Sequence, residues 1–252
     1  MCFFWGSGFG SLDTLRWFMG HTNIEHVYHY ITESTSGEVL RNVKTQFLLE
    51  NNCKAIVIAC NTATANALQE VKELVGNQAL VFDVINPVAE KVAFEIHQNV
   101  GVIATKATVN SGLYRKSIRK LNKYIQVDEL ATPLLVPAIE EGFVNHPITH
   151  AIIYNYLSDK KLKDIETLIL GCTHYPLLIE EIKKYYGTRV RVIDSPKIVA
   201  SYVRDILSKN DLLNPQHEEG NTEFYLSDIT KNFEKISKKF FGNKISLELK
   251  KL

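Results

Sequence analysis

Two short stretches with the same pattern decide the fold: residues 56–62 read IVIACNT and residues 168–174 read LILGCTH. Each is an apolar run followed by a small residue, a cysteine and a polar residue of the kind that begins a helix. The two cysteines, Cys60 and Cys172, lie nearly half a chain apart. The repeat therefore predicts two similar halves, each with one cysteine at the carboxyl end of a buried strand, where open α/β sheets bind their ligands.

Outward from these stretches, short apolar runs alternate with longer amphipathic ones. Apolar, mostly β-branched runs predict strands at residues 55–59, 79–82, 100–104, 168–170 and 190–193. Helical periodicity predicts helices at residues 62–74, 88–97, 111–121, 150–157, 178–186 and 198–207, and a last one within 231–252. This alternation indicates an α/β fold with doubly wound, mainly parallel sheets.

Composition excludes several classes of protein. Lys and Arg total 29 against 28 Asp and Glu, so we expect no broad basic surface and no nucleic-acid partner. No apolar run approaches the ~20 residues of a membrane span, and the N-terminus lacks the early positive charge of a signal peptide. Four cysteines without a CxxC pair and eight scattered histidines predict neither a disulfide framework nor a metal site. A reducing, cytoplasmic setting with free thiols is the expectation.

Two thiols at strand ends, each before a helix, point to a specific chemistry. A helix N-terminus favours the thiolate over the thiol, and it also binds carboxylates. Inversion of an amino-acid Cα requires removal of a proton from one face and delivery of another to the opposite face, which two acid/base residues achieve. Side chains beside the two cysteines are suited to hold amino and carboxylate groups, namely Asn61, Thr62, Thr173 and His174.

Less specific interpretations of the same residues remain open at this point. A cysteine at the end of a buried strand often serves as a small apolar residue, and Cys60 and Cys172 would also serve as a redox pair. A single histidine such as His174 is often structural. Gly8 and Gly10 form a GxGxG-like pattern, but the rest of a nucleotide-binding fingerprint is absent.

Larger segments carry a family resemblance. ACNTATA at 59–65 and GCTHYPLL at 171–178 resemble the two signature segments of the glutamate racemases, which are cofactor-independent amino-acid racemases. His174 distinguishes this pattern from the related aspartate racemases, which usually carry an acid there. Similarity extends to VIATKAT at 102–108, VPAIEEG at 136–142, VIDSPKIVA at 192–200 and FYLSD at 224–228.

The resemblance implies an organisation and a site. It implies two pseudo-symmetric domains, 1–86 plus 195–252 and 87–194, with the active site between them. Cys60 and Cys172 would be the acid/base residues, with His174 and Glu140 tuning the second thiol. The implied substrate-binding residues are Ser7, Asn61, Thr62, Thr108, Thr173 and His174. The family also implies glutamate as substrate, no cofactor, no metal, a homodimer, and supply of D-glutamate for bacterial peptidoglycan.

The N-terminal third departs from the family pattern. Gly6 stands where the family has the Asp that assists the first cysteine, although Ser7 remains. Neither the family's Gly-Asp pair nor its Pro-Tyr-Gly loop is found after Tyr30. Two alternatives therefore stay beside a glutamate racemase: a catalytically impaired protein of this fold that binds a ligand or partner, and a racemase for a different small acid.

Overall fold

The computed structural model describes residues 2–6, 26–32, 44–95, 99–213, 221–226 and 247–249. The chain divides into two compact units, Met1–Val84 with Val199–Leu252, and Ile85–Ile198. Most of the helix expected within 231–252 lies outside the described residues. The described part of that segment, Leu247–Leu249, is a strand, whereas the residues whose spacing indicates the helix, 233–240, are not described, so that expectation stays a prediction.

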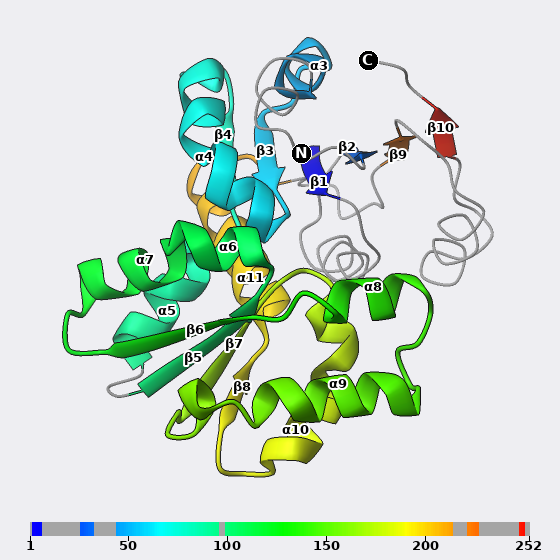
Figure 1. Cartoon of the computed structure of the whole chain (residues 1–252). Helices are drawn as coiled ribbons and strands as arrows, with labels where there is room; N and C mark the ends of the chain where they lie inside the picture. Colours follow the sequence, from blue (N-terminus) through cyan, green and yellow to red (C-terminus); the bar gives the residue numbers. More distant parts are fainter. Residues whose placement is uncertain are drawn as a thin grey trace. The chain divides into compact units, whose positions relative to one another are not determined.

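The first unit holds a parallel sheet in the order β10-β9-β2-β1-β3-β4 (Figure 1). Its strands are β1 Cys2–Gly6, β2 His26–Thr32, β3 Ala55–Ile58, β4 Leu80–Asp83, β9 Asn221–Leu226 and β10 Leu247–Leu249. Every residue of β3 is buried, as expected for an apolar run in the interior of a parallel sheet.

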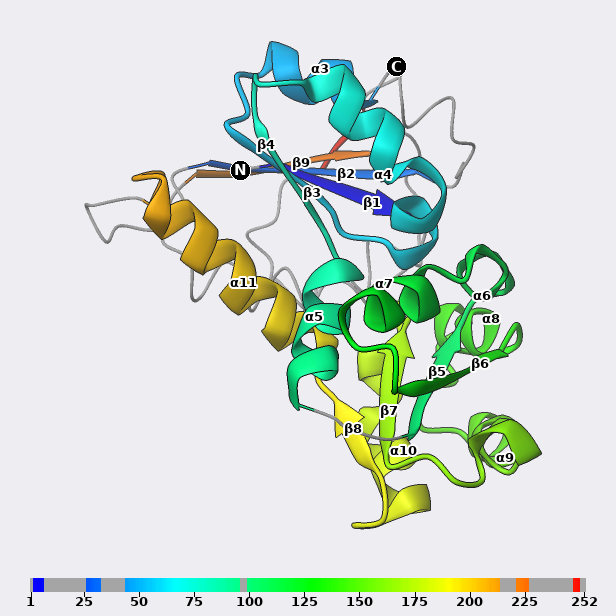
Figure 2. The ribbon, with the colours of Figure 1, turned by 90° about the vertical axis from the view of Figure 1, so that its left-hand side faces the viewer.

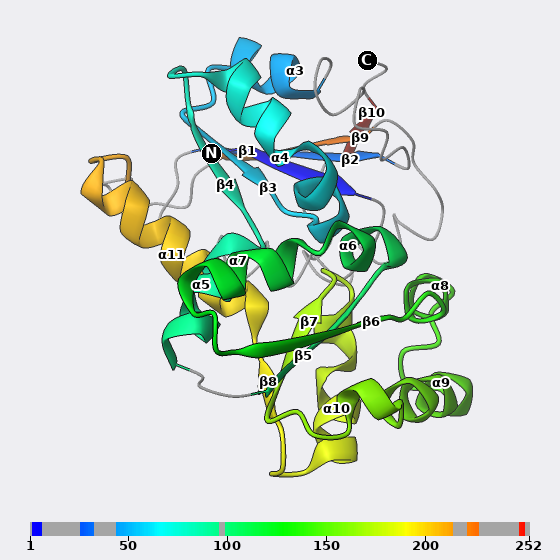
Figure 3. The ribbon, with the colours of Figure 1, turned by 60° about the vertical axis from the view of Figure 1, so that its left-hand side comes forward.

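The second unit holds a parallel sheet in the order β6-β5-β7-β8 (Figure 3). Its strands are β5 Asn99–Ala104, β6 Gln126–Ala131, β7 Thr167–Gly171 and β8 Arg191–Ile193. The polar, alternating β6 is the described strand of this sheet that the apolar-run analysis did not predict.

Both sheets contain the same four-strand arrangement. Numbered along the chain, β2-β1-β3-β4 and β6-β5-β7-β8 both read second, first, third, fourth. In this order the second strand lies on one side of the first strand and the third lies on the other, so the direction of winding reverses between the first and third strands. Ligands of such sheets bind at this position, in the crevice beyond the carboxyl ends of the strands. Cys60 follows the third strand of one sheet and Cys172 follows the third strand of the other.

Helices cover the sheets. The first unit has α3 Thr45–Glu50, α4 Asn61–Val75 and most of α11 Ser195–Lys209; the second has α5 Asn86–Glu95, α6 Lys106–Ser111, α7 Leu113–Leu121, α8 Leu135–Glu140, α9 Pro147–Leu157 and α10 Ile179–Tyr186. The single helix expected over 111–121 is interrupted by Gly112, whose φ of 62° ends α6 in the left-handed conformation.

Successive side chains of each strand point to opposite faces of the sheet, so both faces need a covering layer of helices. In the first unit Ile56 and Ile58 pack against α3 and α4, while α11 lies on the opposite face (Figure 2). In the second unit Leu168 and Leu170 belong to a cluster with residues of α8, α9 and α10, and α5 and α7 cover the other face (Figure 3). Among the described residues, none of the helices combines the length and apolar character that a membrane span requires.

Candidate active site

Cys60 occupies the junction between β3 and α4. Its backbone is extended, with φ −128° and ψ 126°, and its carbonyl accepts the N–H of Thr64 at 2.8 Å. Cys60 is therefore the N-cap of a 15-residue helix, although its side chain makes no capping hydrogen bond. Its thiol forms no disulfide and is half-buried at the carboxyl edge of the sheet. This is the strand-to-helix placement that the sequence predicted.

The neighbours of Cys60 differ in exposure. Asn61, the first residue of α4, is 5% exposed, and Thr62 is half-buried. In the adjacent strand, Phe4 pairs with Ile58, the last residue of β3, and β1 continues for two residues to Gly6. Because Gly6 has no side chain, that position of β1 offers no functional group to the thiol.

Cys172 lies at the equivalent place in the second unit but in a different local structure. It follows Gly171, the last residue of β7, and its carbonyl accepts the N–H of Tyr175 at 3.1 Å. A 3₁₀ helix runs from Tyr175 to Leu178 before α10 begins. The expectation that a helix starts directly after this cysteine was therefore wrong: a turn and a 3₁₀ helix intervene, so Cys172 is not a cap of α10.

A contact chain links Cys172 to a carboxylate. The Sγ of Cys172 lies 3.6 Å from Nδ1 of His174, and Nε2 of His174 lies 3.2 Å from Oε1 of Glu140. Cys172 and His174 are 6% and 3% exposed, whereas the side chain of Glu140, at the end of α8, is 36% exposed. The sequence thus selected three residues that the structure brings together, and Thr173 between them is half-buried.

Two residues that sequence reasoning missed brace this edge of the second sheet. The hydroxyl groups of Thr132 and Tyr175 are 2.6 Å apart, and both residues are fully buried. The Thr132 hydroxyl also donates to the carbonyl of Ala104 at 3.3 Å. Burial is the largest cause that raises the pKa of Tyr175 well above 10, and the nearby Cys172 charge adds to it. Tyr175 therefore remains a protonated hydrogen-bond donor beside Cys172.

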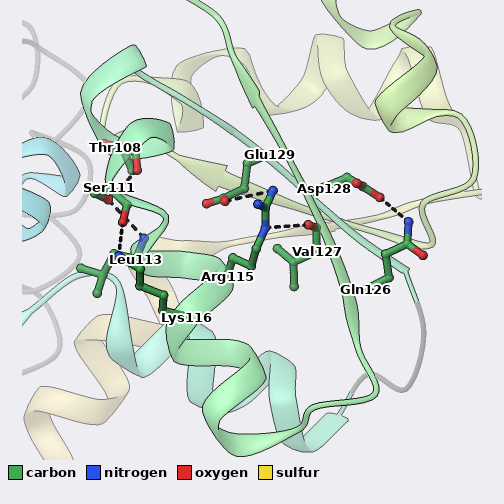
Figure 4. Close-up of polar contacts among 9 residues, drawn as sticks. All are labelled: Thr108, Ser111, Leu113, Arg115, Lys116, Gln126, Val127, Asp128 and Glu129. Atoms are coloured by element: carbon green, nitrogen blue, oxygen red, sulfur yellow. Dashed lines mark hydrogen bonds and ion pairs between the residues drawn. The ribbon is translucent and has the colours of Figure 1, made fainter.

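Thr108 lies in the first turn of α6, where it completes a cap. The hydroxyl of Thr105 accepts the backbone N–H of Thr108 at 3.3 Å, and the two hydroxyl groups are 3.1 Å apart. Ser111 in turn donates to the Thr108 carbonyl at 2.6 Å, and Thr108 is 0% exposed (Figure 4). Ala104 pairs with Gly171, and each strand ends at that pair; the next residue of the first strand is the half-buried Thr105, which the sequence analysis did not single out, and the next residue of the second is Cys172.

Lys44 is a further residue that the sequence analysis did not select. It is the N-cap of α3 and only 2% exposed. Burial lowers its pKa from 10.5 to about 8, and the negative charge of Cys60 opposes that shift. A buried ammonium group is therefore electrostatically coupled to the first thiol.

Other expectations fall outside this geometry. Ser7 lies outside the described residues. Within the described part of the chain no three His, Cys, Asp or Glu residues cluster as a metal site would require. Neither Cys60 nor Cys172 forms a disulfide, but Cys53 is disulfide-bonded, so the expectation of unbonded thiols was wrong for Cys53.

Comparison with known proteins places these features in a family. A model of the Asp/Glu/hydantoin racemase family matches residues 11–203. The glutamate racemase of Geobacter metallireducens is 36% identical over 234 residues, which is 92% of this chain and 82% of that protein. The Neisseria meningitidis serogroup A enzyme is 36% identical over 246 residues, 94% of this chain and 90% of the relative.

Solved structures agree. The glutamate racemase of Francisella tularensis, in complex with D-glutamate, matches with a TM-score of 0.87 at 33% identity, covering 99% of this chain and 96% of that one. A glutamate racemase isoform from Bacillus anthracis matches with a TM-score of 0.90 at 28% identity, covering 100% and 97%. With its repeated parallel sheets and one thiol after the third strand of each, the chain belongs to the Asp/Glu/hydantoin racemase family and, within it, to the glutamate racemases, which are amino-acid isomerases.

Proposed function

We propose that this protein interconverts L- and D-glutamate without a cofactor, using Cys60 and Cys172 as its two acid/base residues. The observation that carries the proposal is the repeated placement of a cysteine thiol, outside any disulfide, within two residues of the end of the third strand along the chain in each sheet, at the ligand-binding edge of the fold. Sequence similarity to glutamate racemases over more than nine-tenths of the chain supports glutamate as the substrate.

The reaction balances with one thiolate and one thiol. The thiolate takes the Cα proton from one face of glutamate, breaking the C–H bond and forming an S–H bond. The opposite thiol gives its proton to the other face of the planar carbanion. The product has inverted configuration, and the two sulfurs have exchanged protonation states. The reverse direction uses the same groups in opposite roles.

Neighbouring groups supply binding and orientation. The first N–H groups of α4, beside Asn61 and Thr62, suit a carboxylate. Thr173 follows Cys172 in the chain, and the half-buried Thr105 follows Ala104, the strand partner of Gly171. We assign both threonines to the substrate together with His174. Ser7 and Thr108 complete the assignment by family resemblance. Thr108, fully buried in the α6 cap, would act chiefly by holding Thr105 in place.

His174 and Glu140 tune the second thiol in this proposal. When Nε2 of His174 donates its hydrogen to Glu140, Nδ1 of the neutral ring is left as an acceptor facing the Cys172 sulfur. The imidazole then accepts the thiol hydrogen bond or, once protonated, stabilises the thiolate. Glu140 acts on the reaction only through this ring.

The proposed setting follows from the product. D-glutamate supplies bacterial peptidoglycan synthesis, so we place the enzyme in the cytoplasm and in cell-wall biogenesis. A homodimer is the proposed assembly, by analogy with other glutamate racemases.

The test follows the Cα hydrogen directly. The protein is incubated with L-glutamate or D-glutamate in deuterated water, and both optical rotation and Cα deuterium are measured. We expect the wild type to racemise both enantiomers with deuterium incorporation. Cys60→Ser and Cys172→Ser each lose racemisation, because one face of Cα then lacks its acid/base group.

The other outcomes are distinct. Binding of D-glutamate without exchange, at high protein concentration, identifies a ligand-binding protein of this fold and overturns the proposed activity. Faster turnover of another small acid, aspartate included, overturns the choice of substrate. Thermal unfolding of each serine variant provides the control, since a folded but inactive variant places the loss in chemistry.

A further inference from the structure

A buried pair of hydroxyl groups joins two distant segments of the second unit. The hydroxyl oxygens of Thr132 and Tyr175 are 2.6 Å apart, although the residues are 43 positions apart in the chain. The Tyr175 hydroxyl also lies 3.3 Å from the Thr132 carbonyl oxygen, and both residues are 0% exposed. A hydrogen bond shielded from water in this way holds its partners in one geometry, because breaking it leaves buried polar groups unsatisfied.

The hydroxyl pair continues to Ala104, the last residue of β5. The Thr132 hydroxyl donates to the Ala104 carbonyl at 3.3 Å, and the Thr132 N–H donates to the same oxygen at 2.9 Å. Because the Thr132 hydroxyl has a single hydrogen, the Tyr175 hydroxyl is the donor between the two side chains. Thr132 directly follows β6. We call this sequence of hydrogen bonds, from Tyr175 through Thr132 to Ala104, the hydroxyl brace.

The hydroxyl brace connects two places that we assign to the reaction. At one end, the N–H of Tyr175 donates to the Cys172 carbonyl at 3.1 Å, which closes the turn that carries Cys172 and His174. At the other end, Ala104 is followed by Thr105, the N-cap of α6. The turn of the second thiol is therefore tied to the residue before a threonine that we assign to the substrate.

The hydroxyl brace acts where the strand ladder has ended. The pairing of β5 with β7 runs to Ala104 and Gly171, so Cys172 lies one residue beyond the last pair. Tyr175 and Thr132 both lie after the strands, and their side chains extend the connection between the segments past the ladder. Fixing a group in this way is what proton transfer requires, because the rate depends steeply on the placement of the reacting atoms.

We propose that Tyr175 and Thr132 are positioning residues for the proton transfer at Cys172, whose turn their hydroxyl groups hold at a fixed place relative to Thr105. This inference rests on the proposed racemase function. Both hydroxyl hydrogens are donated within the brace, so neither group moves a proton itself. Cys60 belongs to the first unit. Loss of the brace therefore slows proton transfer at Cys172 and leaves transfer at Cys60 unchanged.

The test uses Tyr175→Phe, which removes one hydroxyl and keeps the ring. Racemisation of L- and D-glutamate is measured with hydrogen and with deuterium at Cα. We expect kcat/KM to fall by about tenfold to 10²-fold for both enantiomers, since they have equal free energies. The isotope effect on kcat/KM rises for the enantiomer that gives its proton to Cys172, because cleavage of that bond limits the rate more. It falls for the enantiomer that gives its proton to Cys60.

One further variant assigns the enantiomers to the thiols. In Cys60→Ser the thiol of Cys172 remains, so the enantiomer that still exchanges its Cα hydrogen with deuterated water is the one that faces Cys172. The isotope effect of this enantiomer is the one expected to rise in Tyr175→Phe. A rise for the opposite enantiomer contradicts the inference.

Tyr186→Phe is the matched control. Tyr186 is 4% exposed and belongs to the same buried cluster as Tyr175 and Cys172, but its hydroxyl has no hydrogen-bond partner among the described residues. This variant deletes a buried tyrosine hydroxyl without breaking a hydrogen bond. We therefore expect its kcat/KM and both isotope effects to equal those of the wild type.

Variants of Thr132 test the other half of the brace and do not depend on the folding of Tyr175→Phe. Thr132→Ser keeps the hydroxyl and is expected to retain activity. Thr132→Val removes the hydroxyl, keeps the shape and is expected to reproduce the isotope effects of Tyr175→Phe. The double variant loses no more activity than either single variant, because two halves of one interaction are not additive.

Unchanged isotope effects in folded Tyr175→Phe and Thr132→Val overturn the inference, and so do additive losses in the double variant. A smaller folded fraction, measured by thermal unfolding, lowers kcat/KM without altering either isotope effect. The two proposals fail distinguishably. A wild type that exchanges no Cα hydrogen overturns the proposed function and this inference with it. A wild type that racemises glutamate, with variants whose isotope effects are unchanged, overturns only the role of the brace.

Discussion

His174 contacts Glu140 through Nε2 at 3.2 Å, although the two residues are 34 positions apart. The contact joins the end of α8 to the turn after β7, and it fixes the imidazole with its other nitrogen toward Cys172. Orientation of a ring by a carboxylate selects which nitrogen carries the hydrogen. The partly exposed carboxylate therefore influences a buried thiol through one intervening ring.

Replacement of this carboxylate is the first prediction. We expect Glu140→Gln to lower kcat by up to about 10²-fold, the lower end of the range for acid–base assistance, with little change in KM. The loss arises because an amide no longer fixes the hydrogen on Nε2. Steady-state kinetics with both enantiomers provides the measurement. Glu141→Gln, one residue further on and exposed, is the control, and an equal loss there contradicts the interpretation.

Gly171 underlies the second prediction, because no side chain fits at the residue before Cys172. A Cβ there would lie 3.0 Å from the Ala104 Cβ and from the Tyr114 ring, and 3.1 Å from the Ile103 carbonyl oxygen. Gly171→Ala should therefore destabilise the protein by about 1–3 kcal/mol and lower kcat by displacing Cys172. Urea unfolding and turnover test both effects.

A second glycine of the same sheet gives the comparison for Gly171. A Cβ at Gly101 would meet the side-chain ends of Ile165 and Leu162, at 2.7 and 3.0 Å, away from the thiol. Gly101→Ala is expected to reduce stability without reducing kcat. A normal kcat in Gly171→Ala would show that Cys172 tolerates a shift of its strand.

Glu129 carries the third prediction, on pH-dependent stability. Its carboxyl is buried in β6, pairs with Arg115 at 3.3 Å, and leaves Oε1 without a hydrogen bond (Figure 4). Burial raises the pKa of Glu129 above 4.5, against the opposing charge of Arg115. The folded state therefore binds more protons than the unfolded state just above pH 4.5, and this residue's contribution to stability falls as pH rises through its raised pKa.

Glu129→Gln replaces the carboxyl group with an amide that does not titrate, so the pH dependence due to this residue is lost. The difference in unfolding free energy between variant and wild type is expected to shift in favour of the variant as pH rises from 4.5 toward neutrality. Asp128→Asn, on the opposite face of the same strand, is the control. A pH-independent difference for Glu129→Gln would mean that its carboxyl has the same pKa folded and unfolded.

The fourth prediction concerns the stability cost of Lys44. Its pKa of about 8 in the folded protein lies below its ordinary 10.5, so the unfolded state binds more protons between these values. Wild-type stability then rises with pH across this window, whereas Lys44→Met lacks this contribution. At neutral pH the variant is expected to be more stable by up to roughly 3 kcal/mol, with the advantage disappearing above pH 10.5. Chemical denaturation of both proteins from neutral pH to above pH 10.5 measures the two unfolding free energies. A Lys44→Met variant that is less stable than the wild type at neutral pH contradicts the prediction.

The sequence predicted the central strands well because burial on both faces leaves a continuous apolar run. The run at 55–59 became β3 Ala55–Ile58, and the run at 168–170 became β7 Thr167–Gly171. Strand β6, QVDELA, escaped because it lies at the edge of its sheet and alternates polar with apolar residues. The short helix α8 escaped because its six residues, which include Pro137, carry too few helical repeats.

Some residues of the candidate site were predictable from the sequence and others were not. Cys60, Cys172 and His174 stand out locally, since each follows a recognisable strand, and Glu140 was found by family resemblance. Lys44, Thr105 and the Thr132–Tyr175 pair have no local signature: their importance depends on strand register and on contacts between distant segments. The roles assigned to these residues in catalysis and binding remain predictions.

The pairing of β9 with β2 has a consequence for synthesis on the ribosome. Leu226 pairs with Ile31, so an N-terminal strand meets this neighbour only after most of the chain has been translated. Ile85–Ile198 is continuous, and its last strand, which ends at Ile193, is synthesised before β9 begins at Asn221, which allows this unit to fold first. Until then β2 presents an open edge, a template for aggregation, and a premature stop codon before Asn221 leaves that edge permanently uncovered.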